Sequence, residues 1–180
     1  MKTKWMVPIL LLILLCGCGD KEVQADGTAR LIATDSVFVK ACGQVSPDKM
    51  VITVAKTNEE SRKALEKGDT DMAVLSTKDA VELFQKSGEI QALGVISDAE
   101  ADQKCLVVRS EFVKENAPLV DELLQLCAQA AGQEWSLSVG WDMIAKVQSD
   151  CESRFEQDPE GGAAVPDDGF YYFAANPIAS

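Results

Sequence analysis

The chain has 180 residues, six cysteines, no histidine and a formal net charge of −12, from 29 Asp and Glu against 17 Lys and Arg. A chain this acidic offers no basic surface to nucleic acid. Without histidine it lacks the commonest metal ligand and the usual base of nucleophilic and acid–base catalysis. The carboxylates show no pair whose spacing separates it from a solvated acidic face. We therefore predict no catalytic residue, no metal site and no cofactor.

Residues 1–17 have the pattern of an export signal. Lys2 and Lys4 precede an apolar run over residues 7–15, which is too short to span a bilayer comfortably. The run ends in Leu15-Cys16-Gly17-Cys18, which resembles a bacterial lipobox. We expect residues 1–17 to be a lipoprotein signal peptide and Cys18 to carry the lipid, with cleavage at another site as the alternative.

Residues 18–27 are polar and are predicted to form a tether that leads into a single domain over residues 28–180. Loss of Lys2 and Lys4 with the signal leaves 15 of the 17 basic residues against 29 acidic ones, a charge of −14. Such a charge suits a soluble domain held above an anionic membrane. The expected location is the cell envelope, with the lipid anchored to the outer side of the bacterial membrane.

Short apolar runs alternate with amphipathic helices through the first half of the predicted domain. The run at 31–33 is followed by a helical apolar stripe that ends at Gly43. Residues 50–55 are rich in β-branched side chains and are predicted to be a strand. Thr57 or Asn58 then caps the next helix.

The stretch from Ala64 to Gly88 has the pattern of a helix end, a turn, a strand and a second helix. Gly68 is predicted to end the first helix in the left-handed conformation, which glycine adopts without a Cβ penalty. Residues 72–75 are an unbroken apolar run, short enough for a strand that is covered on both faces. Ser76 or Thr77 caps the second helix.

The alternation continues beyond Gly88. Residues 90–96 and 105–108 are predicted strands separated by an acidic loop, and Ser110 is predicted to cap a short helix. A longer helix follows with Pro118 in its first turn, where the missing N–H does no harm. This alternation predicts an α/β fold with a largely parallel sheet and flanking helices.

The C-terminal part has a different pattern. Large apolar residues between 135 and 147 predict a pair of helices with a break near Gly140, and residues 158–169 form a turn-rich loop. An aromatic cluster follows at 170–173. It is either a C-terminal strand or clamp packed on the core, or a stacking surface for a planar ligand or a partner.

Polar side chains follow three of the predicted strands, where the next helix begins. They are Thr34, Ser36, Thr57, Asn58, Ser76 and Thr77. Each such helix N-terminus has N–H groups that suit an anion. In a parallel sheet the three would share one edge, the place where open α/β sheets bind ligands. We predict a ligand-binding site there, with simple helix capping as the alternative for each residue.

Four cysteines lie in the predicted domain, namely Cys42, Cys105, Cys127 and Cys151. Their spacings fit no zinc pattern and no C-x-x-C redox motif. Outside the cytoplasm disulfides persist, and three pairings of two cysteines are open. We expect a disulfide between Cys127 and Cys151, which would join the long helix to the C-terminal region, with small buried thiols as the alternative.

Two segments carry a resemblance to a known family. Residues 64–75 read A-L-E-K-G-D-T-D-M-A-V-L, and residues 105–125 read C-L-V-V-R-S-E-F-V-K-E-N-A-P-L-V-D-E-L-L-Q. In this order, behind an export signal, they resemble the extracytoplasmic solute-binding proteins of ABC transporters, of the nitrate/taurine/sulfonate kind with the type II periplasmic-binding-protein fold. The resemblance spans about residues 34–133.

The resemblance implies a protein that captures a small molecule for an ABC importer without catalysis. It places the loops after the strands at the ligand cleft, which supports Ser76 and Thr77 most and Thr57 and Asn58 next. Members of that family have two lobes, whereas this chain has residues for about one, so an ABC permease or a separate partner lobe is the implied protein partner. The alternative is a lipoprotein interaction module that has lost ligand binding.

Overall fold

The computed structural model describes residues 27–34, 37–45, 48–98, 103–131, 135–159 and 164–175. The predicted signal peptide, the lipid-attachment residue Cys18 and the candidate site residue Ser36 lie outside the described residues.

The described residues fold around one six-stranded sheet with the strand order β2-β1-β3-β5-β4-β6. In chain order the strands are β1 (Ala29–Thr34), β2 (Met50–Ala55), β3 (Met72–Ser76), β4 (Ile90–Asp98), β5 (Lys104–Arg109) and β6 (Trp135–Ser138). β1 pairs in parallel with both β2 and β3, whereas β3–β5, β5–β4 and β4–β6 are antiparallel.

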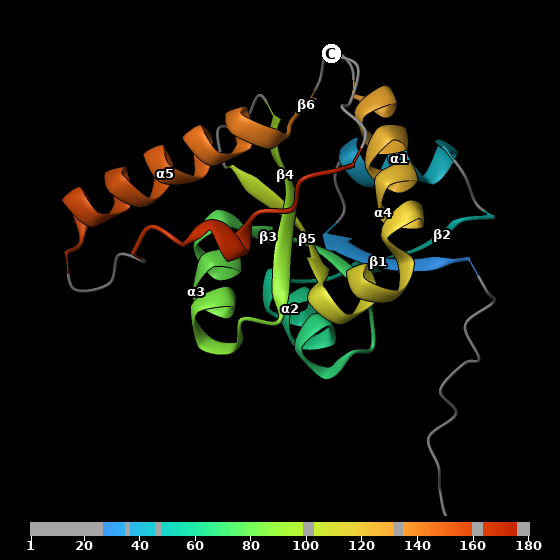
Figure 1. The fold of residues 1–180 in the computed structure, drawn as a ribbon, viewed down its shortest axis with the longest axis horizontal. Coiled ribbons are helices and arrows are strands. Elements are labelled where there is room, and N and C mark those ends of the chain that lie inside the picture. Colours follow the sequence, from blue (N-terminus) through green and yellow to red (C-terminus); the bar gives the residue numbers. More distant parts are fainter. Residues whose placement is uncertain are drawn as a thin grey trace, which may run out of the picture.

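Helices cover both faces of this sheet (Figure 1). They are α1 (Val37–Val45), α2 (Asn58–Lys67), α3 (Thr77–Ser87), α4 (Ser110–Ala130) and α5 (Gly140–Gln157), with a short 3₁₀ turn η1 (Asp168–Phe170) near the end of the chain. α1 and α4 lie on one face, and α2, α3 and α5 lie on the other.

The α/β class and the flanking helices are confirmed, but the sheet is parallel only in its first half. β1, β2 and β3 are each followed by a helix that returns the chain to the start of the next strand. β4 and β5 instead follow one another through residues 99–103, which is too short for a crossover, so the chain reverses and the pair is antiparallel.

Three local predictions need correction. Residues 135–138 form the edge strand β6, not a helix, because they pair with the end of β4, and a run of four residues is too short to distinguish the two periodicities. α1 continues through Gly43 to Val45. The N-terminal flanking residue of α4 is Arg109, which makes no side-chain cap, so Ser110 is the first helical residue and not the cap. The predicted division into a short helix and a longer one that begins near Pro118 is confirmed, because Asn116 has non-helical dihedrals within α4.

The alternating side chains of the strands divide the interior into two cores, one on each face. On the α1/α4 face, Leu31, Met72 and Leu106 pack under the apolar side of α4. On the opposite face, Leu75 and Val107 lie in the core formed with α2, α3 and α5. The central strands β3 and β5 are buried on both faces, which explains their unbroken apolar runs.

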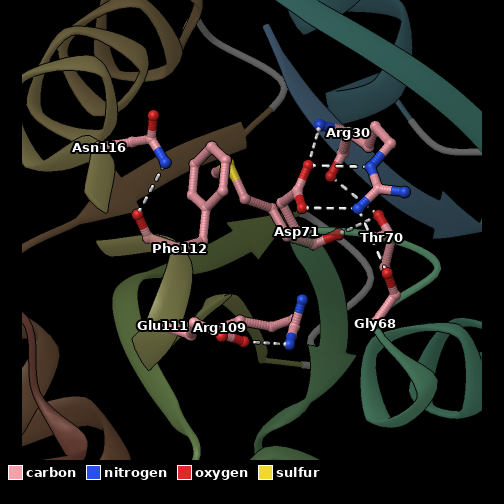
Figure 2. Close-up of polar contacts among 9 residues, drawn as sticks. Arg30, Gly68, Thr70, Asp71, Arg109, Glu111, Phe112 and Asn116 are labelled. Atoms are coloured by element: carbon pink, nitrogen blue, oxygen red, sulfur yellow. Dashed lines mark hydrogen bonds and ion pairs between the residues drawn. The ribbon is translucent and has the colours of Figure 1, made fainter. Parts of the chain in front are cut away.

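A partly buried ion pair between Arg30 and Asp71 joins the amino-terminal ends of β1 and β3 (Figure 2). The Asp71 carboxylate is buried and accepts from Arg30 three times: from Nη2 at 2.8 Å, from Nε at 3.0 Å and from the backbone N–H at 2.9 Å. The Asp71 N–H donates to the Arg30 carbonyl, and the Asp71 carbonyl accepts from the N–H of Arg109 on β5. Arg30 Nη2 also donates to the Gly68 carbonyl, and Thr70 Oγ1 donates to the Arg30 carbonyl at 2.8 Å. One residue, Asp71, thereby sets the position of three strands.

Gly68 ends α2 in the left-handed conformation, as predicted, with φ +75°. Its N–H reaches the carbonyls at the end of the helix, and a Cβ at this position would lie 3.1 Å from Nη1 of Arg109. Gly88 ends α3 in the same conformation, with φ +66°, but a Cβ there would meet nothing within 4 Å. The two glycines therefore share a backbone requirement and differ in the space around them.

Replacing Gly68 by valine should lower the free energy of unfolding by about 2–3 kcal/mol, because a β-branched side chain in the left-handed region is strained and meets Arg109. Gly88→Ala is the matched control and should cost only about 1 kcal/mol. Urea unfolding followed by circular dichroism measures both. A Gly68→Val protein as stable as wild type would show that α2 does not end there.

Replacing Asp71 by alanine should lower the free energy of unfolding by about 2–4 kcal/mol, because Arg30 and its neighbours lose a buried acceptor. Glu59→Ala removes an exposed helical ion pair with Lys63 and should leave the unfolding midpoint unchanged. Equal effects of the two substitutions would contradict the role given to Asp71.

Candidate functional site

The predicted ligand site corresponds to the edge of the sheet where β1, β2 and β3 end, which we call the carboxyl edge. Thr34 lies beside Ala55, so β1 and β2 end level with one another. Ser76, the last residue of β3, lies beside Lys104, the first residue of β5. The parallel arrangement of the first three strands therefore brings the ends of β1, β2 and β3 to one edge, as the sequence predicted.

The alternation of the strands separates the predicted residues between the two faces. Ser76 and Lys104 are a cross-strand pair, and both lie on the α1/α4 side of the sheet because their neighbours Leu75 and Cys105 face the other side. Thr34 follows Ala33, which faces α1 and α4, so it lies on the α2/α3/α5 side. Thr34 and Ser76 therefore do not converge on one point.

The predicted hydroxyls near α2 and α3 have intramolecular partners. Thr57 Oγ1 accepts from the Glu60 N–H at 3.2 Å and caps α2, and the adjacent Asn58 is exposed at the first position of the helix. Ser76 Oγ donates to the Asp79 carboxylate at 2.6 Å and accepts from the Asp79 N–H at 3.1 Å. Of these, Asn58 has a side chain open to solvent, and Ser76 is partly exposed.

Thr77 does not present its side chain at this edge. It is fully buried, and its hydroxyl donates to the carbonyl of Gln103 at 3.1 Å. The Sγ of Cys105 lies 3.9 Å from the same hydroxyl. Thr77 therefore joins the start of α3 to the start of β5, a packing role that the strand-and-cap pattern of the sequence did not distinguish from ligand contact.

The structure adds Lys104 and Gln103 to the carboxyl edge. Lys104 is partly buried and brings a positive charge next to Ser76, and the Oε1 atom of Gln103 is buried without a hydrogen-bond partner among the described residues. Such an atom is an acceptor for a donor from a ligand or from water. One signal for Lys104 was present in the sequence: it is the only basic residue between Ser87 and Arg109.

An aromatic pair borders the same edge on the α1/α4 side. Trp135 begins β6 opposite Asp98 of β4, and its ring packs edge-on against Phe38 of α1 with centroids 5.1 Å apart. Both rings are buried. They belong to the apolar core on the α1/α4 face.

Two pockets of the described residues lie elsewhere. One, of about 230 Å³, is at the opposite end of the sheet between the ends of α2 and α3, and Arg109 and Glu89 are part of its lining. The other, of about 300 Å³, is mostly apolar and lies between Phe155 of α5 and Val165. Neither of these two pockets lies at the carboxyl edge.

Among the described residues, no group of three or more Cys, Asp and Glu side chains is placed to hold a metal ion. Within the same ranges, no helix is both long and apolar enough to cross a membrane.

The four cysteines of the domain are buried free thiols, and the expected Cys127–Cys151 pairing is not formed. Cys127 lies in the core on the α1/α4 face, whereas Cys151 lies in the core on the other face, so the sheet separates them. The sulfur nearest to Cys127 is that of Cys42, at 3.6 Å. The sequence placed Cys42, Cys105 and Cys127 on apolar stripes but could not show which face of the sheet each stripe covers.

The aromatic cluster near the C-terminus is mainly a clamp on the core. Phe170 and Tyr171 are buried, and Tyr171 lies beside β4, where the Tyr172 N–H donates to the Ala92 carbonyl. Tyr172 Oη donates to the Asp121 carboxylate of α4 at 2.6 Å, and the Ala175 N–H donates to the same carboxylate. The last described residues therefore cross the edge of the sheet and bind to α4 (Figure 1).

Three solved structures align with most of this chain. An ABC transporter protein from Parabacteroides distasonis aligns with 82% of this chain and 99% of its own, with a TM-score of 0.55 at 11% identity. The periplasmic aliphatic sulphonate binding protein SsuA from Escherichia coli aligns with 87% of this chain and 95% of its own (TM-score 0.57, 7% identity). The alkanesulfonate-binding protein SsuA from Xanthomonas axonopodis pv. citri, bound to MOPS, aligns with 79% of this chain and 98% of its own (TM-score 0.53, 8% identity).

No protein-family model matches the chain. No curated protein sequence matches it either. At identities of 7–11% the structural likeness establishes the fold. The chain has the fold of periplasmic solute-binding proteins, and this agrees with the resemblance found in its sequence.

The two tyrosines of the C-terminal clamp, Tyr171 and Tyr172, should make the stability of the protein fall as the pH becomes alkaline. Burial raises the pKa of Tyr171 from 10.0 to about 12, and burial together with the hydrogen bond to Asp121 raises the pKa of Tyr172. In the unfolded chain both phenols ionise near pH 10, while the folded state still holds their protons. The tyrosine contribution to stability is therefore complete below pH 10 and is lost as the pH rises toward the folded pKa values.

Urea unfolding of the wild type, Tyr171→Phe and Tyr172→Phe at pH 8, 10 and 11 measures this effect. The decline between pH 8 and pH 11 should be shallower in each variant than in the wild type. Burial also raises the pKa of Cys105 from 9.0 to about 12, so this thiol lowers the stability at alkaline pH in all three proteins. The tyrosine effect is therefore read from the difference between each variant and the wild type. Identical slopes in all three proteins would contradict the assignment.

Proposed function

We propose that this chain is a lipid-anchored solute-binding protein, or a single-lobe relative of one, that captures a small molecule for an ABC importer without catalysis. The observation that carries the proposal is the fold, which aligns with solute-binding proteins over 79–87% of the chain. Anchoring through Cys18, a location in the cell envelope and an ABC permease or separate partner lobe as partner belong to the same proposal. Binding alone needs no acid–base group, which suits a chain without histidine.

The ligand in this proposal is a small organic anion of the sulfonate type, held at the carboxyl edge. Lys104 places a positive charge beside Ser76, and the N-terminus of α3 begins at the same point. The Asp79 carboxylate already occupies the first turn of α3 and accepts from Ser76 Oγ, so the charge that favours an anion at this edge is that of Lys104. Two of the structural neighbours are named for sulfonates, and one of them holds MOPS.

An alternative function is a lipoprotein interaction module that has lost ligand binding. Trp141 is 79% exposed and Phe173 is 51% exposed, and their rings lie 6.1 Å apart near the start of α5. Val51 and Val54 are also exposed on the edge strand β2. Exposed aromatic and aliphatic side chains of this kind are common at protein interfaces.

Isothermal titration of the folded domain against taurine, alkanesulfonates, sulfate, amines and pyrimidines tests the proposal. A sulfonate should bind, and Lys104→Gln should weaken binding about tenfold or more, because one charge-assisted contact is lost. Lys86→Gln, at the opposite end of the sheet, is the matched control and should bind like the wild type.

Binding of a neutral or cationic compound would keep the solute-binding function and replace the ligand class. If a folded domain bound none of these compounds, the interaction module would be the better explanation.

A further inference from the structure

Two cysteines that lie far apart in the sequence meet in the core on the α1/α4 face. The Sγ atoms of Cys42 in α1 and Cys127 in α4 are 3.6 Å apart, although 85 positions separate the residues in the chain. Each side chain is about 1% exposed. The Cys42 thiol donates to the sulfur of Cys127, so the two side chains already point toward one another.

Among the four described cysteines, the sheet leaves each of these sulfurs only the other as a partner. Cys105 and Cys151 belong to the core on the opposite face, with the backbone of the sheet in between. A disulfide has an S–S length of about 2.05 Å. The two sulfurs would have to approach by about 1.6 Å from their 3.6 Å separation, a movement of the size that side-chain rotation provides.

We propose that Cys42 and Cys127 form a disulfide that ties α1 to α4. The two S–H bonds break and one Sγ–Sγ bond forms, releasing two protons and two electrons. The acceptor is a disulfide oxidant, either oxidised glutathione or a thiol–disulfide oxidoreductase. Its S–S bond takes up the electrons and protons and becomes two thiols. The exchange passes through a mixed disulfide with one of the two cysteines.

Burial determines when this bond can form. The hydrogen bond that the Cys127 thiol shares with Cys42 and the loss of hydration raise the pKa of Cys127, so little thiolate is present in the folded protein. An oxidant also has no direct access to either sulfur. Oxidation therefore belongs to folding, before α1 and α4 close on one another. After folding, the same burial protects the bond from reductants.

The proposal is tested by differential alkylation of protein folded with oxidised and reduced glutathione. Cys16 and Cys18 are replaced by serine so that four thiols remain. The protein is unfolded in urea with iodoacetamide, then reduced and labelled with N-ethylmaleimide, and its peptides are analysed by mass spectrometry. Cys42 and Cys127 should carry the second label, and Cys105 and Cys151 the first.

Two variants separate a bridge from incomplete labelling. In Cys127→Ala, Cys42 should change from the second label to the first because its partner is gone. In the matched control Cys105→Ala, Cys42 and Cys127 should keep the second label. The oxidised wild type should melt about 5–15 °C above the reduced protein, and this gap should vanish in Cys127→Ala but persist in Cys105→Ala.

The proposal is overturned if Cys42 and Cys127 both take the first label after folding with oxidant, or if either is found bridged to Cys105 or Cys151. None of these readouts involves solute binding or the location of the protein. A failure here therefore leaves the proposed function untouched, and the reverse also holds.

Discussion

The Asp71 carboxylate is the contact on which the arrangement of the central strands depends. It is buried at the amino-terminal ends of β1 and β3, and it accepts from the side chain and the backbone of Arg30 (Figure 2). The backbone of Asp71 also bonds to Arg30 on one side and to Arg109 on the other. A buried carboxylate without such donors would be strongly destabilising. The ion pair therefore fixes β1 against β3, and the backbone bond from Arg109 to Asp71 adds β5.

That fixed position determines what meets at the other end of the sheet. Once β3 and β5 are in register at Asp71, the last residue of β3 must lie beside the first residue of β5, and Ser76 and Lys104 become neighbours. The polar groups of the carboxyl edge are thus positioned by a structural contact about a strand length away. The cluster around Asp71 is rich in charge, but its donors and acceptors are paired with one another, and we assign it to stability and not to binding.

The sheet also acts as a barrier between two separate interiors. Cys42 and Cys127 share one core, and Cys105 and Cys151 share the other, so a side chain can find partners only on its own face. The C-terminal segment connects the two sides at the sheet edge, because Tyr171 enters the core with Cys151 while Tyr172 reaches Asp121 of α4. The C-terminal segment therefore holds the helices on the two faces of the sheet together, which no single helix does.

The sequence by itself determined the local structure wherever a few neighbouring residues decide it. Gly68 and Gly88 end their helices with positive φ, Thr57 caps α2, and the apolar run at 72–75 is a strand, because these features follow from backbone sterics and local hydrogen bonds. The alternation of strands and helices was likewise sufficient to predict an α/β fold, and the resemblance of residues 64–75 and 105–125 pointed to the solute-binding family.

Only the tertiary structure decided which residues meet. It reversed the sheet at β4–β5, made residues 135–138 a strand, turned Thr77 into the core and placed Lys104 next to Ser76. It also paired Cys127 with Cys42 across 85 positions of sequence. A periodic apolar pattern states that a side chain is buried, but the face on which it is buried depends on the register and direction of strands far away in the chain. That long-range information is not contained in any local pattern.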